Sequence, residues 1–230
     1  MIKQYPRLLA FAFLSVASLA ASAIPIAGLV NTGAGGTAGQ QDKNYAFSVQ
    51  AGSAVSNGYS YITKDQTGVF PFVSNAWAPN DVNSKWLTPS ANQGQSYDTT
   101  KSPGQYTWTL NFDLTGDDIS TAMFDVRWMS DNSSSAYLNG QLIGTTATSK
   151  DSFVKWTDSG KVSSGFVTGL NTLSFVVNNY LAPPNNPAGL RVEFVSSSVT
   201  ALPVPEPGTY ALMVAGLLGL VGVARRRRSS

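Results

Sequence analysis

Cysteine and histidine are both missing from the 230 residues of the chain. Without cysteine there are no disulfides, no thiolate metal sites and no cysteine nucleophiles. Without histidine the chain lacks the commonest general base and the commonest transition-metal ligand, so a Ser-His-Asp triad cannot be built. We therefore expect no catalytic residues, no resident metal and no enzyme activity.

Charged residues are also scarce, at 12% of the chain, and the formal net charge of +2 is unevenly distributed. Lys3 and Arg7 precede an apolar block at the start of the chain, and residues 225–228 are four arginines near its end. Without these six, nine basic residues remain against 13 acidic ones. The part between the two ends is thus acidic, which argues against nucleic acid as a partner.

Residues 1–23 have the three parts of a secretory signal peptide. Lys3 and Arg7 supply the positive charge, residues 8–19 the apolar segment, and Ala21-Ser22-Ala23 the small residues of a cleavage site. An uncleaved N-terminal anchor is the alternative, but the apolar segment is short for a membrane span. We expect the secretion translocon and signal peptidase as partners, with cleavage after Ala23 directed by Ala21 and Ala23.

The C-terminal end carries a second apolar block. Residues 209–224 lack charge and are predicted to form a single transmembrane helix, with residues 225–230 as a basic cytoplasmic tail. A helix of this kind would also place the preceding chain outside the cytoplasm. The alternative, a buried core helix, is disfavoured because such helices rarely end in four arginines.

Residues 201–208 form a proline-rich linker that contains Pro205, Glu206 and Pro207. With the apolar segment and Arg225, Arg226, Arg227 and Arg228 after it, this motif resembles the PEP-CTERM sorting signal of Gram-negative bacteria. The resemblance implies recognition by exosortase, a membrane-embedded protease that acts near the motif and sends its substrate to the cell surface. It also implies an association with exopolysaccharide and an inner-membrane precursor.

Residues 42–200 are predicted to form an all-β domain, after a Gly-rich, flexible lead-in at residues 24–41. Apolar and polar residues alternate with the period of two that is typical of half-buried strands. Asn139-Gly140 between two such runs indicates a tight hairpin. These features predict an antiparallel, jelly-roll-like β-sandwich. The clear strands contain 106–114, 122–128, 136–143, 173–177 and 190–194, and the weaker ones are 45–50, 59–63, 153–156 and 166–168.

The order of motifs from Asp125 to Phe194 resembles the galactose-binding-like fold of many carbohydrate-binding modules. The matching segments are Val126-Arg127-Trp128, Ser130-Asp131-Asn132, Tyr137-Leu138-Asn139-Gly140 and Gly169-Leu170-Asn171-Thr172-Leu173. The resemblance implies the architecture more strongly than a ligand, because members of the fold bind different molecules.

Candidate ligand-binding residues are aromatic or amide side chains in polar segments. Trp77, Trp86 and Tyr180 could stack on sugar rings, and Asp131 and Asn132 could bind saccharide hydroxyls. The alternatives are that the aromatic residues close the ends of the sandwich and that the polar residues form turns.

Asp113, Asp117 and Asp118 surround Thr115-Gly116 and could bind Ca²⁺, although their spacing differs from that of an EF-hand and a plain turn is the alternative. The combined hypothesis is a non-enzymatic surface or matrix protein associated with exopolysaccharide. Two alternatives remain open: a specific carbohydrate-binding module, or a polysaccharide hydrolase that uses Asp131 or Asp118.

Overall fold

The computed structural model describes residues 22–50, 53–64, 71–72, 76–94, 104–146, 151–180, 187–203 and 207–228. Most of the signal peptide, with Ala21, lies outside these residues, as do Pro205 and Glu206 of the sorting motif. The signal peptide and its cleavage site therefore stay predictions.

The described residues contain eleven strands and one helix. The strands are β1 (Ala23–Ile24), β2 (Gln41–Val49), β3 (Gly58–Ile62), β4 (Leu87–Thr88), β5 (Gly104–Asp113), β6 (Asp117–Asp131), β7 (Ser133–Leu138), β8 (Gln141–Thr146), β9 (Thr157–Val162), β10 (Leu170–Asn179) and β11 (Gly189–Ala201). The helix is α1 (Pro207–Arg228). The described part of the β domain contains no helix, as its sequence pattern predicts.

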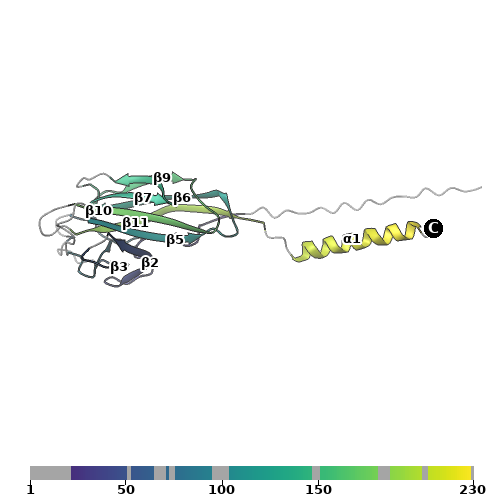
Figure 1. Ribbon diagram of the computed structural model, residues 1–230, viewed down its shortest axis with the longest axis horizontal. Helices are drawn as coiled ribbons and strands as arrows, with labels where there is room; N and C mark the ends of the chain where they lie inside the picture. Colours follow the sequence, from purple (N-terminus) through teal and green to yellow (C-terminus); the bar gives the residue numbers. More distant parts are fainter. Residues whose placement is uncertain are drawn as a thin grey trace, which may run out of the picture.

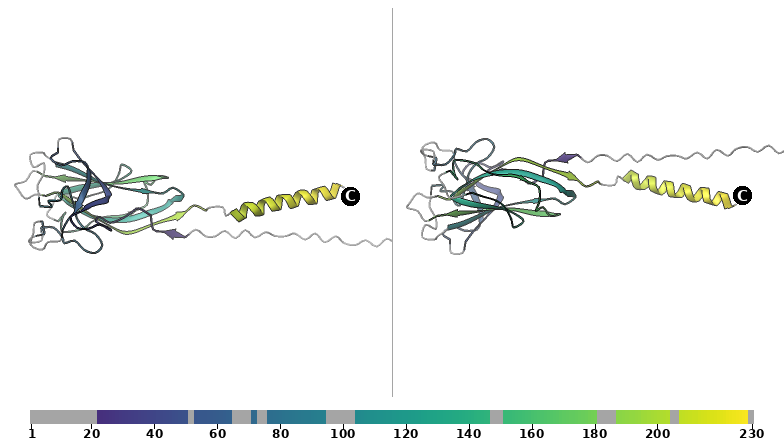
Figure 2. Two further views of the ribbon diagram at one scale, coloured as in Figure 1. Left: turned by 90° about the horizontal axis from the view of Figure 1, so that it is seen from below. Right: turned by 90° about the horizontal axis from the view of Figure 1, so that it is seen from above.

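The strands form one antiparallel path that folds over on itself. Its order is β8-β7-β10-β5-β2-β3-β4-β11-β6-β9, and β1 pairs with β11. Seen edge-on, the long strands lie in two facing layers (Figure 2). The all-β, antiparallel prediction is confirmed, whereas the galactose-binding-like assignment stays a prediction.

The main core lies between the layers and comes from the alternating residues of the long strands. In β5, Tyr106, Trp108, Leu110 and Phe112 are buried while their neighbours are more exposed. The same alternation runs through β10, whose residues pair with β5 from Leu170↔Asp113 to Asn179↔Gly104. Burial of this apolar surface is the main term that stabilises the domain.

The hairpin between β7 and β8 has the predicted two-residue turn. Asn139 and Gly140 have φ of 50° and 80°, the left-handed values that a type I′ turn requires. The Asn139 side chain also donates to Gly165 O at 2.8 Å and accepts from Thr172 N at 2.9 Å. The turn therefore ties together the neighbouring loop and β10.

Two of the weaker strand predictions are wrong. Residues 153–156 form turns that precede β9, and residues 166–168 lie in a loop before β10. Their apolar residues are used elsewhere: Phe153 and Trp156 pack on a second cluster, and Phe166 packs edge-on against Phe124 at 5.6 Å. Alternation over three or four residues is too short to distinguish a strand from a packed loop.

The segment expected to form a flexible lead-in packs onto the sandwich. Ile26 belongs to the main core, and Thr32 N donates to Val192 O at 3.1 Å. The Tyr45 hydroxyl donates to Val30 O at 2.7 Å. These contacts join the segment to β11 and β2, so it forms part of the folded domain.

The antiparallel connections give the sandwich two distinct ends. We call the end that carries residues 114–116, 139–140, 163–169 and Leu202 the tail pole, and the opposite end, with residues 76–86, 131–132, 151–156 and Tyr180, the loop pole. The chain leaves the tail pole toward α1, and β1 lies at the same pole (Figures 1 and 2).

Helix α1 extends away from the sandwich (Figure 1). Pro207 suits the first position of a helix, where its missing N–H is not needed. The positive charges of the four arginines in the last turn interact favourably with the negative end of the helix dipole. Its described side chains are all exposed, which is against the alternative of a buried core helix.

The predicted transmembrane helix at residues 209–224 needs correction. Within the described ranges, no helix combines the length and apolar character needed to cross a membrane. The uncharged stretch before Arg225 is shorter than the roughly 20 residues that a span uses, and glycines interrupt it.

Candidate functional site

The five predicted ligand-binding residues lie together at the loop pole. Trp77 donates from Nε1 to Asp131 Oδ2 at 2.7 Å, and Asn132 donates from Nδ2 to Asp131 Oδ1 at 2.6 Å. The Tyr180 N–H donates to Asn132 Oδ1 at 3.0 Å. Trp86 stacks on Trp77 with ring centroids 4.3 Å apart. One connected network thus spans three separate segments of the chain, residues 76–86, 131–132 and Tyr180.

Trp77 and Trp86 are not exposed platforms, however. Their relative exposures are 3% and 0%, and with Met129 they form a second hydrophobic cluster. Gly189 lies so close beneath Trp77 that a Cβ there would overlap the ring. Sugar stacking needs a free ring face, so the structure favours the alternative in which both tryptophans close the end of the sandwich.

Asp131 is a buried carboxylate within this network. Burial raises the pKa of Asp131 to about 7, although the hydrogen bonds from Trp77 and Asn132 oppose the rise. Both of its oxygens accept hydrogen bonds from neighbouring side chains. The group therefore holds the network together, and Asn132 and Tyr180 continue it toward Ser133, whose Oγ lies 2.8 Å from the Tyr180 hydroxyl.

A second group of residues, which sequence reasoning missed, lies on the outer face of β6 and β11. The Trp156 ring has the guanidinium carbons of Arg127 and Arg191 at 4.6 and 4.9 Å from its centroid. Trp156 is half-buried. Cation–π attraction of this kind orients the ring. The signal in the sequence was the pair of arginines on the polar side of two clear strands.

A chain of ion pairs surrounds this tryptophan. Arg191 Nη2 lies 2.6 Å from Asp81 Oδ2, and Arg127 Nη2 lies 2.7 Å from Glu193 Oε1. Ser84 Oγ links the two pairs, accepting from Arg191 Nε at 2.8 Å and donating to Glu193 Oε2 at 3.1 Å. Burial by itself would raise the pKa of Asp81, but hydrogen bonds from backbone N–H groups and the nearby Arg191 charge outweigh it and lower the pKa. Both arginines are thus neutralised by carboxylates.

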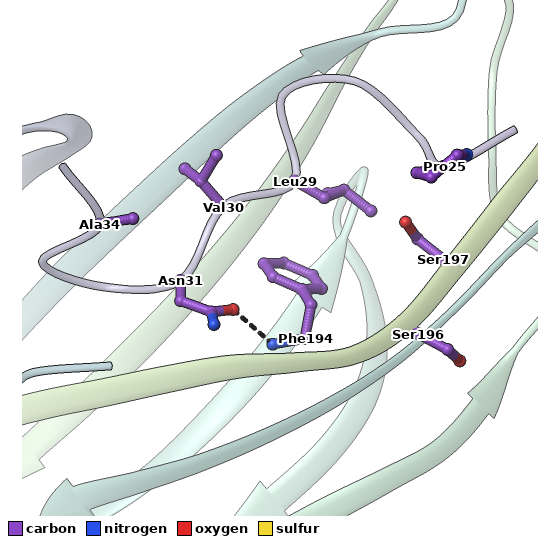
Figure 3. A pocket seen from close by; sticks show the side chains of 8 residues that line it. All are labelled: Pro25, Leu29, Val30, Asn31, Ala34, Phe194, Ser196 and Ser197. Carbon is purple, nitrogen blue, oxygen red and sulfur yellow. Dashed lines mark hydrogen bonds between the residues drawn. The ribbon is translucent and has the colours of Figure 1, made fainter. Parts of the chain in front are cut away.

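A hollow of about 550 Å³ lies between residues 25–34 and β11 (Figure 3). Asn31 crosses it and accepts from Phe194 N at 2.7 Å, while Leu29, Val30 and Phe194 form its apolar walls. All of its lining residues are uncharged. It offers no acid, base or ionic ligand, so its chemistry is limited to apolar and amide contacts.

The three aspartates considered for Ca²⁺ are used in local turns. Asp113 Oδ1 accepts from the Thr115 N–H and hydroxyl, which lowers the pKa of Asp113. Asp118 Oδ1 accepts hydrogen bonds from the Ser120 N–H and hydroxyl. Across the described residues, no three acidic side chains are grouped as metal ligands. These contacts favour the plain-turn alternative.

The sorting tail begins directly at the tail pole. The Leu202 N–H donates to Gly116 O at 2.8 Å, which fixes the chain one residue after β11. Helix α1 begins at Pro207. Only residues 203–206 separate these two points along the chain, and they include the predicted recognition residues Pro205 and Glu206.

Comparison with known proteins supports this tail. Residues 203–228 match the family described as the PEP-CTERM protein-sorting motif. The predicted sorting motif is thereby confirmed. It supports an exported protein whose membrane-anchored precursor is processed by exosortase for the cell surface. No curated protein matches the chain.

Several solved structures resemble the β domain weakly. The Bifidobacterium dentium β-glucuronidase bound to coumarin-3-O-glucuronide is 16% identical, with a TM-score of 0.28 over 60% of this chain and 21% of its own. The Kluyveromyces marxianus β-glucosidase in complex with glucose is 13% identical, with a TM-score of 0.32 over 74% and 18%. The Ruminococcus gnavus β-glucuronidase is 11% identical, with a TM-score of 0.29 over 67% and 30%. The chain spans less than a third of each enzyme, and similarity at this level assigns no activity.

Proposed function

We propose that this chain is a non-enzymatic surface or matrix protein, exported and then processed by exosortase. The single observation that carries the proposal is the sorting motif at residues 203–228, whose helix α1 extends away from the folded domain (Figure 1). A protease that acts on the motif would release the whole sandwich without cutting a strand.

Processing is tested by following the full-length chain in a bacterium with exosortase and in the same strain without it. We expect conversion to a shorter form only where exosortase is present. Replacing Pro205, Glu206 and Pro207 by alanine should abolish the conversion, and deleting Arg225 to Arg228 should impair sorting. Equal processing in the strain without exosortase would contradict the proposal.

The proposed role of the sandwich is contact with exopolysaccharide or with neighbouring matrix proteins. The charged residues around Trp156 support a binding rather than a catalytic role, because Arg127 is paired with Glu193 and Arg191 is paired with Asp81. Asp131, whose pKa is raised by burial, already accepts two hydrogen bonds inside the fold. A hydrolase would need such a group to face its substrate.

The carbohydrate-binding alternative is supported by one specific feature, the half-buried Trp156 beside Arg127 and Arg191. An indole that is only partly buried and is flanked by hydrogen-bond donors is suited to a sugar ligand. Affinity gels that contain the host's exopolysaccharide would test it, with Trp156→Ala as the variant. The control is Tyr59→Ala, which removes an aromatic residue that is 39% exposed on β3. Loss of retardation with Trp156→Ala alone would favour the binding module.

A further inference from the structure

Exposed apolar side chains gather at the tail pole. Leu170 is 65% exposed, Val167 44% and Leu202 48%, and Leu142 and Ile24 are similarly exposed. Backbone contacts place Leu170 and Leu202 at the same turn, residues 113–116: Leu170 pairs with Asp113, Leu114 N donates to Gly169 O, and Leu202 N donates to Gly116 O. Val167 lies in the loop that leads into Leu170. Clusters of exposed apolar residues next to a functional segment are typical of docking surfaces.

The linker is too short to separate this pole from whatever recognises the motif. Five Cα–Cα steps join Leu202 to Pro207, and an extended chain covers at most about 3.6 Å per residue, or about 18 Å in all. Glu206 lies one step nearer. A protease that binds the motif with an interface of ordinary size, about 800 Å² on each partner, would therefore also reach the tail pole.

The charges of the pole favour a protein rather than a lipid partner. Asp113, Asp117 and Asp118 lie beside the apolar residues, at the turn between β5 and β6. Carboxylates at this place would be repelled by an anionic bilayer, whereas a protein surface can complement them with cations.

We propose that the tail pole, through Val167, Leu170 and Leu202, is a second docking surface for the protease that processes the tail. This proposal rests on the proposed function, since it concerns the same processing event. The motif supplies the segment that is acted on, and the pole supplies additional contact that holds the folded domain against the protease. Recognition is then shared between the tail and the body of the substrate.

The test compares rates of precursor conversion in membranes that contain exosortase. The full chain carrying Val167→Ser and Leu170→Ser should be converted about tenfold more slowly, as expected for the loss of central apolar contacts in an interface. The matched control is Val82→Ser, which removes a side chain that is 98% exposed at the loop pole. Because these side chains are exposed, thermal denaturation should give the same midpoint for all three proteins.

A second variant lengthens the linker by 24 Gly and Ser residues between Pro203 and Val204. It weakens the coupling between motif and pole, so it should slow conversion and reduce the additional effect of the double substitution. Faster conversion of the lengthened chain would show that the domain obstructs the protease, which would overturn the proposal. So would equal rates for the double variant and the unsubstituted chain.

Lipid contact is distinguished by the partition of the same proteins into protein-free vesicles of neutral and anionic phospholipid. The double variant and the unsubstituted chain should partition equally. A loss of partition that parallels the loss of rate would assign the surface to lipid and overturn the proposal. Failure of the proposed function appears differently, as an unsubstituted precursor that exosortase does not convert at all.

Discussion

The buried carboxyl group of Asp131 should make the stability of the domain depend on pH. Its pKa is about 7 in the folded protein, against roughly 3.9 for an aspartate in an unfolded chain. The folded state therefore holds a proton that the unfolded state has lost, and stability falls as pH rises between these values. Three pH units at 1.36 kcal/mol each correspond to at most about 4 kcal/mol.

The variant that isolates this contribution is Asp131→Asn. The asparagine can still accept from Trp77 Nε1 but does not titrate. The free energy of unfolding of the unsubstituted protein, minus that of the variant, should decrease by about 3 kcal/mol between pH 4.5 and pH 7.5. Above pH 7.5 the difference should be constant.

Urea denaturation followed by tryptophan fluorescence measures this difference, since Trp77 contacts the carboxylate directly. Asp81 and Asp113 act in the opposite direction, because their pKa values are lowered and their stabilisation is lost as pH falls below about 4. Measurements above pH 4.5 avoid the pH range in which Asp81 and Asp113 become protonated. Parallel pH profiles for the two proteins would refute the reasoning about Asp131.

Four further substitutions test the packing of the two poles, each by urea denaturation. Gly189→Ala places a Cβ against the Trp77 ring and should cost about 2 kcal/mol; an unchanged midpoint would show that the ring can move aside. Asp81→Asn should cost about 2–3 kcal/mol, more than Arg191→Met, because it leaves a guanidinium that is 2% exposed without its ion-pair partner, whereas Arg191→Met leaves a carboxylate that is 49% exposed to water. Equal costs for those two variants would contradict this account. Asn139→Ala loses a left-handed turn residue with its side-chain hydrogen bonds and should cost about 2 kcal/mol, whereas a cost below about 0.5 kcal/mol would show that the turn does not need them.

The long strands could be predicted from the sequence because each has one buried and one more exposed side. The alternation of Tyr106, Trp108, Leu110 and Phe112 is strict, and the structure buries those four residues. Asn139-Gly140 likewise specifies its turn by local backbone preference. The sorting motif was also predictable, since its order of proline, apolar and basic residues is local in the sequence.

The loop pole could not be predicted in the same way. Leu190, Arg191 and Val192 are consecutive and all buried, which requires cover on both faces of β11. The segment that contains Trp77 and Trp86 provides this cover, and no periodicity within β11 indicates it. Alternation with Leu190, Val192 and Phe194 alone would put Arg191 and Glu193 on a solvent-exposed face, whereas the folded chain buries both beneath a loop.

The position of β11 has a mechanical consequence. This strand leads directly into the tail, and it lies inside the sheet, with β6 paired along it from Gly189 to Ala201 and β4 and β1 on its other side. A pull on the C-terminal end, opposed by a grip at the far end of the molecule, is directed along the strand axis. The hydrogen bonds between β11 and its neighbouring strands are then loaded together in shear and are not opened one after another. We therefore expect the domain to withstand stretching between a cell and its surroundings.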